Sequence, residues 1–237
     1  MISDQRLRLG IVIPLANEEL TIDELLRRVC AQIGPDDRVF CVLDNMCKDN
    51  TKLMIQGFLE NVDNRVSLVW APENRCVVDA YFRGYREAYD AGCAWILEMD
   101  GGLSHLPEEI PQFVMGMEEG YDYVGGSRYL KGGTHDSPLS RRIISRGGTA
   151  LTRLLLRVRL TDMTSGFECF SRTAMELVLK NGVRSRANFF QTEIRYMMSH
   201  LHWKEVPIRY TNDKPTIGRS SLRESFRILF QLLKERS

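Results

Sequence analysis

Residues 8–19 read RLGIVIPLANEE, a short apolar run over 8–15 that Pro14 ends and that the polar residues Asn17, Glu18 and Glu19 follow. Such a run predicts a buried β-strand that ends where the polar residues begin. Two further runs have the same form, RVFCVL at 38–43 and AWILEM at 94–99. Each therefore predicts a strand that delivers polar side chains to its carboxyl end.

The segments around these strands complete a repeating pattern. Further strands are expected at 66–70 and 121–125, and apolar residues at helical spacing predict helices at 21–30, 51–59, 76–91 and 107–119. Repeated strand–helix units predict an α/β fold with a mostly parallel sheet and helices on both faces. Ligands of such sheets bind beyond the carboxyl ends of the strands. The polar clusters at those ends are Asn17-Glu18-Glu19, Asp44-Asn45 and Asp100-Gly101-Gly102.

The second half of the chain has a different character. A glycine-rich loop leads into a predicted helix at 139–158, whose apolar residues are expected to share one face while several arginines share another. The expected apolar face consists of Leu139, Ile143, Ala150, Leu151, Leu154, Leu155 and Val158. A strand or hairpin is expected over 161–172, then helices near 172–180 and 189–200, a strand at 203–210 and a final helix at 221–235. With no internal repeat, we expect one domain over 1–237.

The composition is that of an ordinary globular protein. The chain has 237 residues, of which 43% are hydrophobic and 27% charged, which excludes collagen-like, disordered and disulfide-scaffold proteins. No apolar run approaches the ~20 residues that a membrane-spanning helix needs, and the polar start does not resemble a signal peptide. The six cysteines form no CxxC pair, so we expect free thiols in a reducing cytoplasm.

Charge is divided unevenly along the chain. Residues 1–125 contain 11 Lys and Arg against 22 Asp and Glu, whereas residues 126–237 contain 21 against 9. A basic half of this size predicts an anionic partner such as a phosphate or a lipid head group. The other interpretation is that the two halves neutralise each other across an internal interface. No aromatic-interleaved motif accompanies the basic residues, so we expect no nucleic acid partner.

The order of these motifs resembles that of a known family, the inverting GT-A glycosyltransferases, and within it the dolichol-phosphate mannose synthase group. The resemblance runs from about residue 9 to about residue 233. It is carried by the segments IVIPLANEE, LDNMCKDNT, MDGGLSHLPEEIPQF, VGGSRYLKGG, SRRIISRGGTALTRLLL and DMTSGFECFSR. The resemblance implies a GT-A fold, with 1–125 binding a nucleotide sugar and 126–237 binding the acceptor.

The resemblance also implies roles for single residues. The residues implied to bind the nucleotide sugar are Pro14, Ala16, Glu18, Asp44, Asp100 and Gly101. Asp44 would accept hydrogen bonds from the base, whose N–H groups suit a carboxylate, although an Asp after a strand is also a common turn cap. Asp100 would be catalytic as the ligand of Mg²⁺ or Mn²⁺, which prefer oxygen ligands.

The sequence departs from the family at the expected diphosphate contacts. Gly102 stands where the second acid of the metal motif is expected, so Asp100 is the remaining acid, and Glu98 is a second possible ligand because alternate residues of a strand share a face. Asn45 replaces a further acid of the family. Ser221 stands at an expected lysine, for which Arg219 or Arg223 would supply the cation.

The acceptor site is expected among arginines, whose planar guanidinium binds phosphate oxygens in pairs. The residues implied for the acceptor phosphate are Arg128, which would also be catalytic, with Arg141, Arg142, Arg146 and Arg219. A phosphate monoester ionises with a second pKa of ~6, so it needs no strong general base. Gln191 and Glu193 match a family segment near the site, although a structural role is equally compatible with helical spacing, and His105 is expected to pack rather than to act as a base.

The resemblance thus implies transfer of a sugar, mannose from GDP-mannose, to polyprenyl or dolichyl phosphate, with inversion at the anomeric carbon. The enzyme would sit peripherally on the cytoplasmic face of a membrane, with its basic amphipathic helices on the lipid surface. Two alternatives remain: a related glycosyltransferase with a soluble acceptor, and a catalytically weak nucleotide-sugar binding protein.

Overall fold

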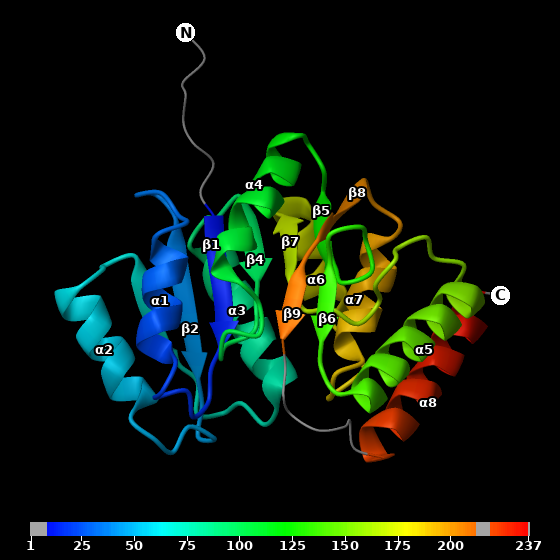
Figure 1. Cartoon of the computed structure of the whole chain (residues 1–237), viewed down its shortest axis with the longest axis horizontal. Coiled ribbons are helices and arrows are strands. Elements are labelled where there is room, and N and C mark those ends of the chain that lie inside the picture. The colour runs from blue at the N-terminus through cyan, green and yellow to red at the C-terminus, as the bar shows by residue number, and fades with distance from the viewer. Residues whose placement is uncertain (1–8, 212–218, 237) are drawn as a thin grey trace, which may run out of the picture.

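The computed structural model describes residues 9–211 and 219–236, and a seven-stranded sheet forms its centre (Figure 1). The strands of this sheet are β1 (Leu9–Pro14), β2 (Arg38–Leu43), β3 (Val66–Trp70), β4 (Trp95–Glu98), β5 (Tyr123–Ser127), β7 (Glu168–Ser171) and β8 (Trp203–Pro207). A small second sheet pairs β6 (Thr134–Asp136) with β9 (Arg209–Thr211). The helices are α1 (Ile22–Cys30), α2 (Thr51–Asn61), α3 (Val77–Asp90), the 3₁₀ turn η1 (Pro107–Glu109), α4 (Ile110–Glu118), α5 (Leu139–Leu156), α6 (Arg172–Asn181), α7 (Phe190–Met198) and α8 (Arg219–Arg236).

The strand order in the large sheet is β3-β2-β1-β4-β7-β5-β8. The pairs of β1 with β2 and β4, of β2 with β3 and of β5 with β8 are parallel, whereas β7 runs antiparallel between β4 and β5. The predicted mostly parallel α/β sheet is therefore confirmed. The antiparallel β7 brings the loop before it, residues 161–167, to the carboxyl end of β4.

Apolar helix faces cover both sides of the sheet. Helices α1, α2 and α4 share one hydrophobic cluster with side chains such as Ile11 and Ile13, and helices α3, α6 and α7 share a second cluster with Val12. The alternation along β1 explains this division, because successive residues of a strand point to opposite faces. Both layers leave the carboxyl ends of the central strands uncovered.

Most predicted elements appear within one or two residues of their expected bounds. The predicted helix at 107–119 begins as the 3₁₀ turn η1, and the predicted strand at 203–210 divides at Ile208 into β8 and β9. Within 161–172 a single strand, β7, forms, so a hairpin is the wrong interpretation there. Strand β6 had no prediction, because its residues Thr-His-Asp carry no apolar pattern.

Helix α5 divides its expected apolar face between the outer surface and the interior. Leu139, Ile143 and Leu154 are 68%, 62% and 76% exposed, while Ser145 and Thr149 are buried on the opposite side. Helix α5 lies beside α8 at one end of the molecule (Figure 1), where Leu151 and Leu155 pack against the second hydrophobic cluster while Leu139, Ile143 and Leu154 point outward.

Candidate active site

The first wall of the site is a pair of loops that follow β1 and β2. The Asn17 side chain donates to the Met46 carbonyl (3.1 Å) and accepts from the Lys48 N–H (2.8 Å). The Glu18 N–H donates to Thr51 Oγ1 (2.8 Å), and Asp49 accepts from the N–H of the neighbouring loop residue Glu19 (3.0 Å). These bonds hold the two loops as one rigid unit.

Two carboxylates in this unit, those of Asp49 and Asp44, accept hydrogen bonds that hold the loops in shape. Burial opposes the ionisation of Asp49, but hydrogen bonds from Thr51 and the Glu19 N–H lower its pKa to about 2. Asp44 is nearly buried at the end of β2, and its Oδ1 accepts from the Met46 N–H (2.8 Å). Asp44 thus caps a turn, which leaves Oδ2 for the predicted bonds with a base. The other predicted nucleotide residues in this wall, Pro14 and Ala16, are half-buried and exposed.

Asp100 follows β4 directly and lines the cavity described below. Its Oδ1 accepts a hydrogen bond from the Tyr81 hydroxyl on α3 (2.7 Å), and its N–H donates to Nδ1 of His105 (3.1 Å). The other nitrogen of His105, Nε2, is buried without a hydrogen-bond partner among the described residues and lies 3.9 Å from Asp100 Oδ2. Burial lowers the pKa of His105 to about 4, so the ring is neutral near pH 7. With its ring stacked on Phe167 (4.8 Å), His105 packs as the sequence analysis expected.

The two glycines after Asp100 form a tight turn against the first loop. Gly102 has φ +67°, a backbone conformation that glycine adopts at low cost. A Cβ at Gly102 would stand 3.0 Å from Oε2 and 3.1 Å from Oε1 of Glu18. A Cβ at Gly101 would collide with Leu15, at 2.5 Å. The Glu18 carboxylate therefore occupies the space into which a side chain at 102 would project.

Glu98 does not serve as the second ligand that the strand periodicity suggested. It is fully buried and stands opposite Glu168 in the β4–β7 pair. Burial, together with the nearby Glu168 and Asp100, raises the pKa of Glu98 well above its usual range. A buried, protonated carboxyl group is a poor ligand for a cation.

Arg128 follows β5 and is nearly buried in an ion pair that the sequence analysis did not anticipate. Its Nε and Nη2 donate to the two carboxylate oxygens of Asp162 (2.7 and 2.8 Å), and Nη2 also donates to Thr164 Oγ1 (2.6 Å). Burial alone would raise the pKa of Asp162, but Arg128 holds it well below its usual range. Nη1 of Arg128 has no hydrogen-bond partner within the described chain, which leaves one edge of the guanidinium for a ligand.

A fully buried arginine on α7, Arg195, fixes the loop that carries Asp162. Its Nε donates to the Ser165 carbonyl (3.1 Å) and to Glu168 (2.8 Å), and its Nη2 donates to the Gly126 carbonyl (3.0 Å). Sequence analysis missed both Arg195 and Asp162. The signal for Arg195 was its position four residues after Gln191, one helical turn away on a helix next to the site.

Glu193, two residues before Arg195, has a structural role. Its carboxylate accepts from the N–H groups of Arg184 and Ser185 and so ties the loop before α7 to the helix. Gln191 instead lines the cavity.

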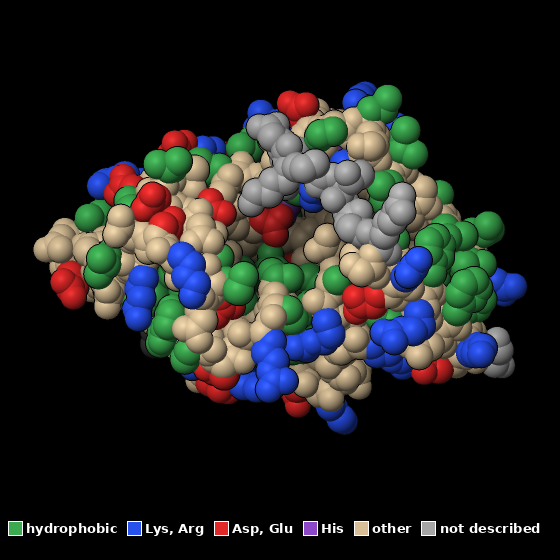
Figure 2. Space-filling model, turned by 90° about the horizontal axis from the view of Figure 1, so that it is seen from below, with side chains coloured by type: hydrophobic (Ala, Val, Ile, Leu, Met, Phe, Trp, Pro, Cys, Tyr) green, Lys and Arg blue, Asp and Glu red, His purple; other side chains and the backbone are tan. Residues whose placement is uncertain are grey.

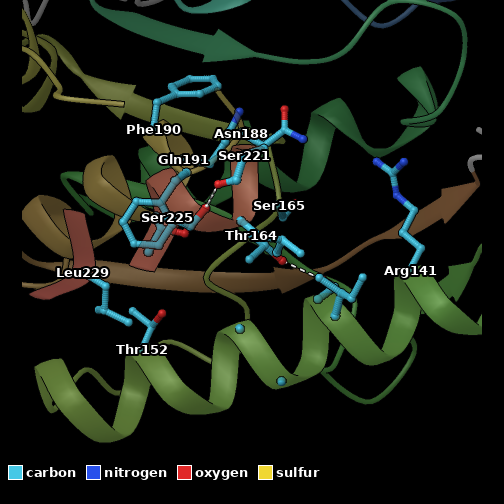
Figure 3. A pocket seen from close by; sticks show the side chains of 18 of the residues that line it. Arg141, Thr152, Thr164, Ser165, Asn188, Phe190, Gln191, Ser221, Ser225 and Leu229 are labelled. Carbon is cyan, nitrogen blue, oxygen red and sulfur yellow. Dashed lines mark hydrogen bonds between the residues drawn. The ribbon is translucent and has the colours of Figure 1, made fainter. Parts of the chain in front are cut away.

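The cavity, of about 530 Å³, joins Asp100, Arg128 and Gln191 to the space between α5 and α8 (Figure 3), whereas the loops after β1 and β2 do not line it. Its polar part includes Tyr81, Asp100, Arg128, Arg141 and Tyr210. Its apolar part includes Ile144, Leu151, Leu222, Phe226 and Leu229. Figure 3 shows Arg141 at one end of this space and Leu229 at the other. Among the described lining residues Asp100 is the single carboxylate, whereas two arginines are present.

The remaining predicted acceptor arginines are divided between the cavity and the outer surface. Arg141 lines the cavity and donates to the Tyr210 hydroxyl (3.3 Å). Arg142 and Arg146 do not line it, and Arg146 lies on the Tyr129 ring. The side chain of Arg219 lies outside the described residues. Figure 2, which looks onto the carboxyl ends of β1 and β2, shows a hollow and, beyond it, basic and hydrophobic side chains over α5 and α8.

Ion pairs between the acidic and the basic half of the chain neutralise only part of the charge asymmetry of the sequence. Three ion pairs within the described residues join the acidic half to the basic half, and they are Arg186–Asp79, Lys204–Glu119 and Arg209–Glu109. Arg142, Arg146 and Arg153 on α5 form no ion pair within residues 9–211 and 219–236. Internal neutralisation thus accounts for a minority of the basic residues.

Residues 10–179 match the model of glycosyl transferase family 2. The chain belongs to this family. Family 2 membership makes it a glycosyltransferase, as the resemblance implied. In the part of the chain that the structure describes, the helices lack the length and apolar character needed to span a bilayer.

Among characterised relatives, a polyprenol monophosphomannose synthase of Mycolicibacterium smegmatis is 27% identical over 89% of this chain and 80% of its own. A dolichol-phosphate mannosyltransferase of Pyrococcus furiosus is 26% identical over 96% of this chain and 64% of its own. An undecaprenyl-phosphate mannosyltransferase of Micrococcus luteus is 28% identical over 60% of this chain and 59% of its own. The chain thus spans less than two thirds of the length of two of these three relatives.

Solved structures confirm the fold. Glucosyl-3-phosphoglycerate synthase of Mycobacterium tuberculosis, in complex with Mn²⁺, UDP and glucosyl-3-phosphoglycerate, superimposes with a TM-score of 0.67 at 15% identity. The match covers 98% of this chain and 80% of that one. A complex of the same synthase with Mn²⁺, UDP-glucose and phosphoglyceric acid has a TM-score of 0.65.

Proposed function

We propose that the protein transfers a sugar from a nucleotide sugar to a polyprenyl phosphate, with inversion at the anomeric carbon, and that the donor is GDP-mannose. The names of the characterised relatives support the acceptor class. In this proposal, residues 1–125 bind the nucleotide sugar and residues 126–237 bind the acceptor, in one domain.

The observation that carries the proposal is the change of character along the cavity. At the sheet, two arginines and one carboxylate line it; between α5 and α8, its walls are apolar. Gly147 and Gly148 keep this second part wide, since a Cβ on either would meet no atom within 4 Å. An anionic head with a long apolar tail matches both parts, whereas a small soluble phosphate would leave the apolar part empty of ligand.

The proposed chemistry needs little from a general base. A phosphate monoester is largely dianionic near pH 7, with a second pKa of ~6, so its oxygen can attack the anomeric carbon directly. Arg128 Nη1 and the Arg141 guanidinium would hold that phosphate, and the rigid Asp162 pair would fix the direction of Arg128. Arg142 and Arg146, which do not line the cavity, would attract the anion on its approach, together with Arg219, whose side chain lies outside the described residues.

On the donor side, the loops that carry Pro14, Ala16, Glu18 and Asp44 would hold the nucleotide, with Asp44 Oδ2 accepting from the base. The donor set fits a hard divalent cation, because Mg²⁺ and Mn²⁺ are often held by one or two carboxylates plus substrate phosphates and waters. Asp100, kept in place by Tyr81 and beside Gly101, would hold the cation. When bound, the cation would neutralise charge on the leaving diphosphate.

The outer surface of α5 and α8 supports a peripheral membrane location, on the cytoplasmic face. Exposed apolar side chains, among them Ile143, Leu154 and Phe230, lie on the two helices that also present basic residues such as Arg146 and Arg153. Basic amphipathic helices lie in the head-group region of anionic membranes. The cavity opens between the same two helices, so a lipid tail could pass from the bilayer into it.

The experiment that tests the proposal compares donors and acceptors in one assay. The full chain, with Mg²⁺ or Mn²⁺, is given labelled GDP-mannose, UDP-glucose or their exchanged pairs, together with undecaprenyl phosphate in detergent or 3-phosphoglycerate in solution. We expect labelled lipid from GDP-mannose. Transfer only to the soluble acid would instead establish the soluble-acceptor alternative, and nucleotide binding without any transfer would contradict the lipid-phosphate proposal.

A further inference from the structure

Gly102 stands where the resemblance predicts an acid, which this chain lacks at that position. The turn from Asp100 to Leu103 has two successive left-handed residues, Gly102 (φ +67°) and Leu103 (φ +59°). Left-handed backbone at a residue other than glycine is costly and is typical of functional sites. The turn is therefore held in a specific shape against the loop that contains Glu18.

The Glu18 carboxylate fills the place of the missing side chain. Both its oxygens lie within 3.1 Å of the point where a Cβ at Gly102 would stand. Glu18 comes from the β1–α1 loop, far from Gly102 in the sequence, and no spacing rule connects the two positions. The fold thus places the negative charge of Glu18, from a different loop, where the side chain of an acid at position 102 would lie.

The surroundings hold Glu18 in that direction while leaving it available. Its N–H is bound to Thr51 Oγ1 (2.8 Å), and Thr21 Oγ1 donates to Oε2 (3.0 Å). The other oxygen, Oε1, has no hydrogen-bond partner within residues 9–211 and 219–236.

A second, independent observation points to a ligand beside Asp100. His105 is fully buried, and its Nε2 nitrogen lacks a hydrogen-bond partner among the described residues although it lies 3.9 Å from Asp100 Oδ2. Unpaired buried polar atoms are rare in folded proteins. A small shift of the Asp100 carboxylate would satisfy this N–H, in the way that partners of metal-binding carboxylates commonly orient them.

We propose that Glu18 is the second protein ligand of the divalent cation, together with Asp100, and replaces the acid that is absent at Gly102. Two carboxylates on two different loops then hold the cation, and nucleotide phosphates and water complete its shell. The proposal rests on the proposed function in one respect, namely that a divalent cation binds with the nucleotide at Asp100.

The test exchanges the position of the acid and measures cation binding rather than activity. Mn²⁺ is titrated into the full chain with GDP, and in parallel with UDP, and free Mn²⁺ is followed by electron paramagnetic resonance. The variants are Glu18→Gln, which keeps an oxygen for Thr21, the double variant Glu18→Gln with Gly102→Asp, and Glu19→Gln as the matched control. Thermal unfolding without metal verifies that each variant folds.

We expect Glu18→Gln to weaken Mn²⁺ binding by about tenfold or more, since loss even of an outer partner of a ligand costs about 10–100-fold. Glu19→Gln, whose carboxylate binds Asn50 in the loop, should bind Mn²⁺ like the wild type. The double variant should recover most of the lost affinity, because the neutral amide of Gln no longer repels the carboxylate that Gly102→Asp introduces and has to move by only a few tenths of an ångström to make room for its Cβ.

Three results would overturn the proposal. Wild-type affinity in Glu18→Gln would show that Glu18 is not a ligand, while the proposed sugar transfer would still stand. A double variant that folds but binds Mn²⁺ as weakly as Glu18→Gln would show that the two positions do not serve one place. Absence of Mn²⁺ binding by the wild type with either nucleotide would refute the cation of the proposed function and this inference together.

Discussion

The Arg128–Asp162 ion pair supports a prediction in which folding and transfer can be separated. Sequence alone predicts that Arg128→Ala loses transfer far more than stability. The structure changes that expectation, because the side chains of Arg128 and Asp162 are 5% and 0% exposed. Removal of Arg128 leaves the buried Asp162 carboxylate without its charge partner, and breaking such a pair lowers the free energy of unfolding by about 3–5 kcal/mol. In a chain of this size, 1 kcal/mol corresponds to about 2–4 °C in Tm, so we expect a decrease of roughly 6–20 °C.

A double variant then isolates the chemical role. Arg128→Met with Asp162→Asn removes both charges, and the Asn amide oxygen can still accept from the Thr164 N–H that now binds Asp162 (3.1 Å). Replacing both members of a buried pair is often nearly neutral for stability. We expect the double variant to regain more than half of the lost Tm but to transfer sugar at least about tenfold more slowly, since a charge-assisted contact contributes ~1.5–3 kcal/mol.

Chemical denaturation and initial rates with labelled donor measure the two effects on the same samples. The pH dependence provides a further control. The pKa of Asp162 is depressed in the folded state, so its contribution to stability is complete above the unfolded pKa of ~3.9 and diminishes as the pH falls below it. In the double variant, the free energy of unfolding should lack this dependence on acid pH. A double variant with normal transfer would refute a phosphate-binding role for Arg128, and a stable Arg128→Ala would refute the energetic argument.

Three further predictions concern the cation, the groove and the surface. Asp100→Asn should reduce transfer by about 100-fold or more with little change in Tm; near-normal rates that still require Mn²⁺ would show that the cation binds elsewhere. Gly148→Leu should fill the apolar part of the cavity and reduce transfer to undecaprenyl phosphate more than to a short-chain phosphate. The control Gly57→Leu, also at a glycine with open space around it, should change transfer to neither acceptor. Equal effects of Gly148→Leu on both acceptors would contradict binding of the lipid tail in the apolar part. Binding to anionic liposomes, measured by co-sedimentation, should weaken as salt rises, because exposed charges are screened over ~8 Å at physiological ionic strength, and indifference to liposomes would contradict the membrane surface. Replacement of three arginines of α5 with glutamine should reduce that binding; the three are Arg142, Arg146 and Arg153.

Local patterns in the sequence were sufficient for the sheet and for its ligand-binding edge. Apolar runs of about four to six residues, each followed by polar ones, fix where a strand is buried and where it ends, because both properties depend on neighbours in the chain. The run at 94–99 thus placed Asp100 at the sheet edge, whereas Arg128 was found through the resemblance alone, because β7 lies between β4 and β5 in the sheet. The resemblance to a family added the roles of these residues, since chemistry is not readable from periodicity.

Tertiary structure alone decided which side chains meet. Helical spacing indicates that Leu139 and Ile143 share a face of α5, but it cannot say whether that face meets the sheet or the surroundings. In the same way, Glu98 and Asp100 share a strand face by spacing, yet the antiparallel β7 buries Glu98 against Glu168. Glu18 reaches the empty place at Gly102 because a bond to the neighbouring loop fixes its backbone and the Thr21 hydroxyl holds its carboxylate. Contacts of this kind join residues that are distant in the chain, and their energy depends on burial and on partner charges, which exist only once the chain has folded.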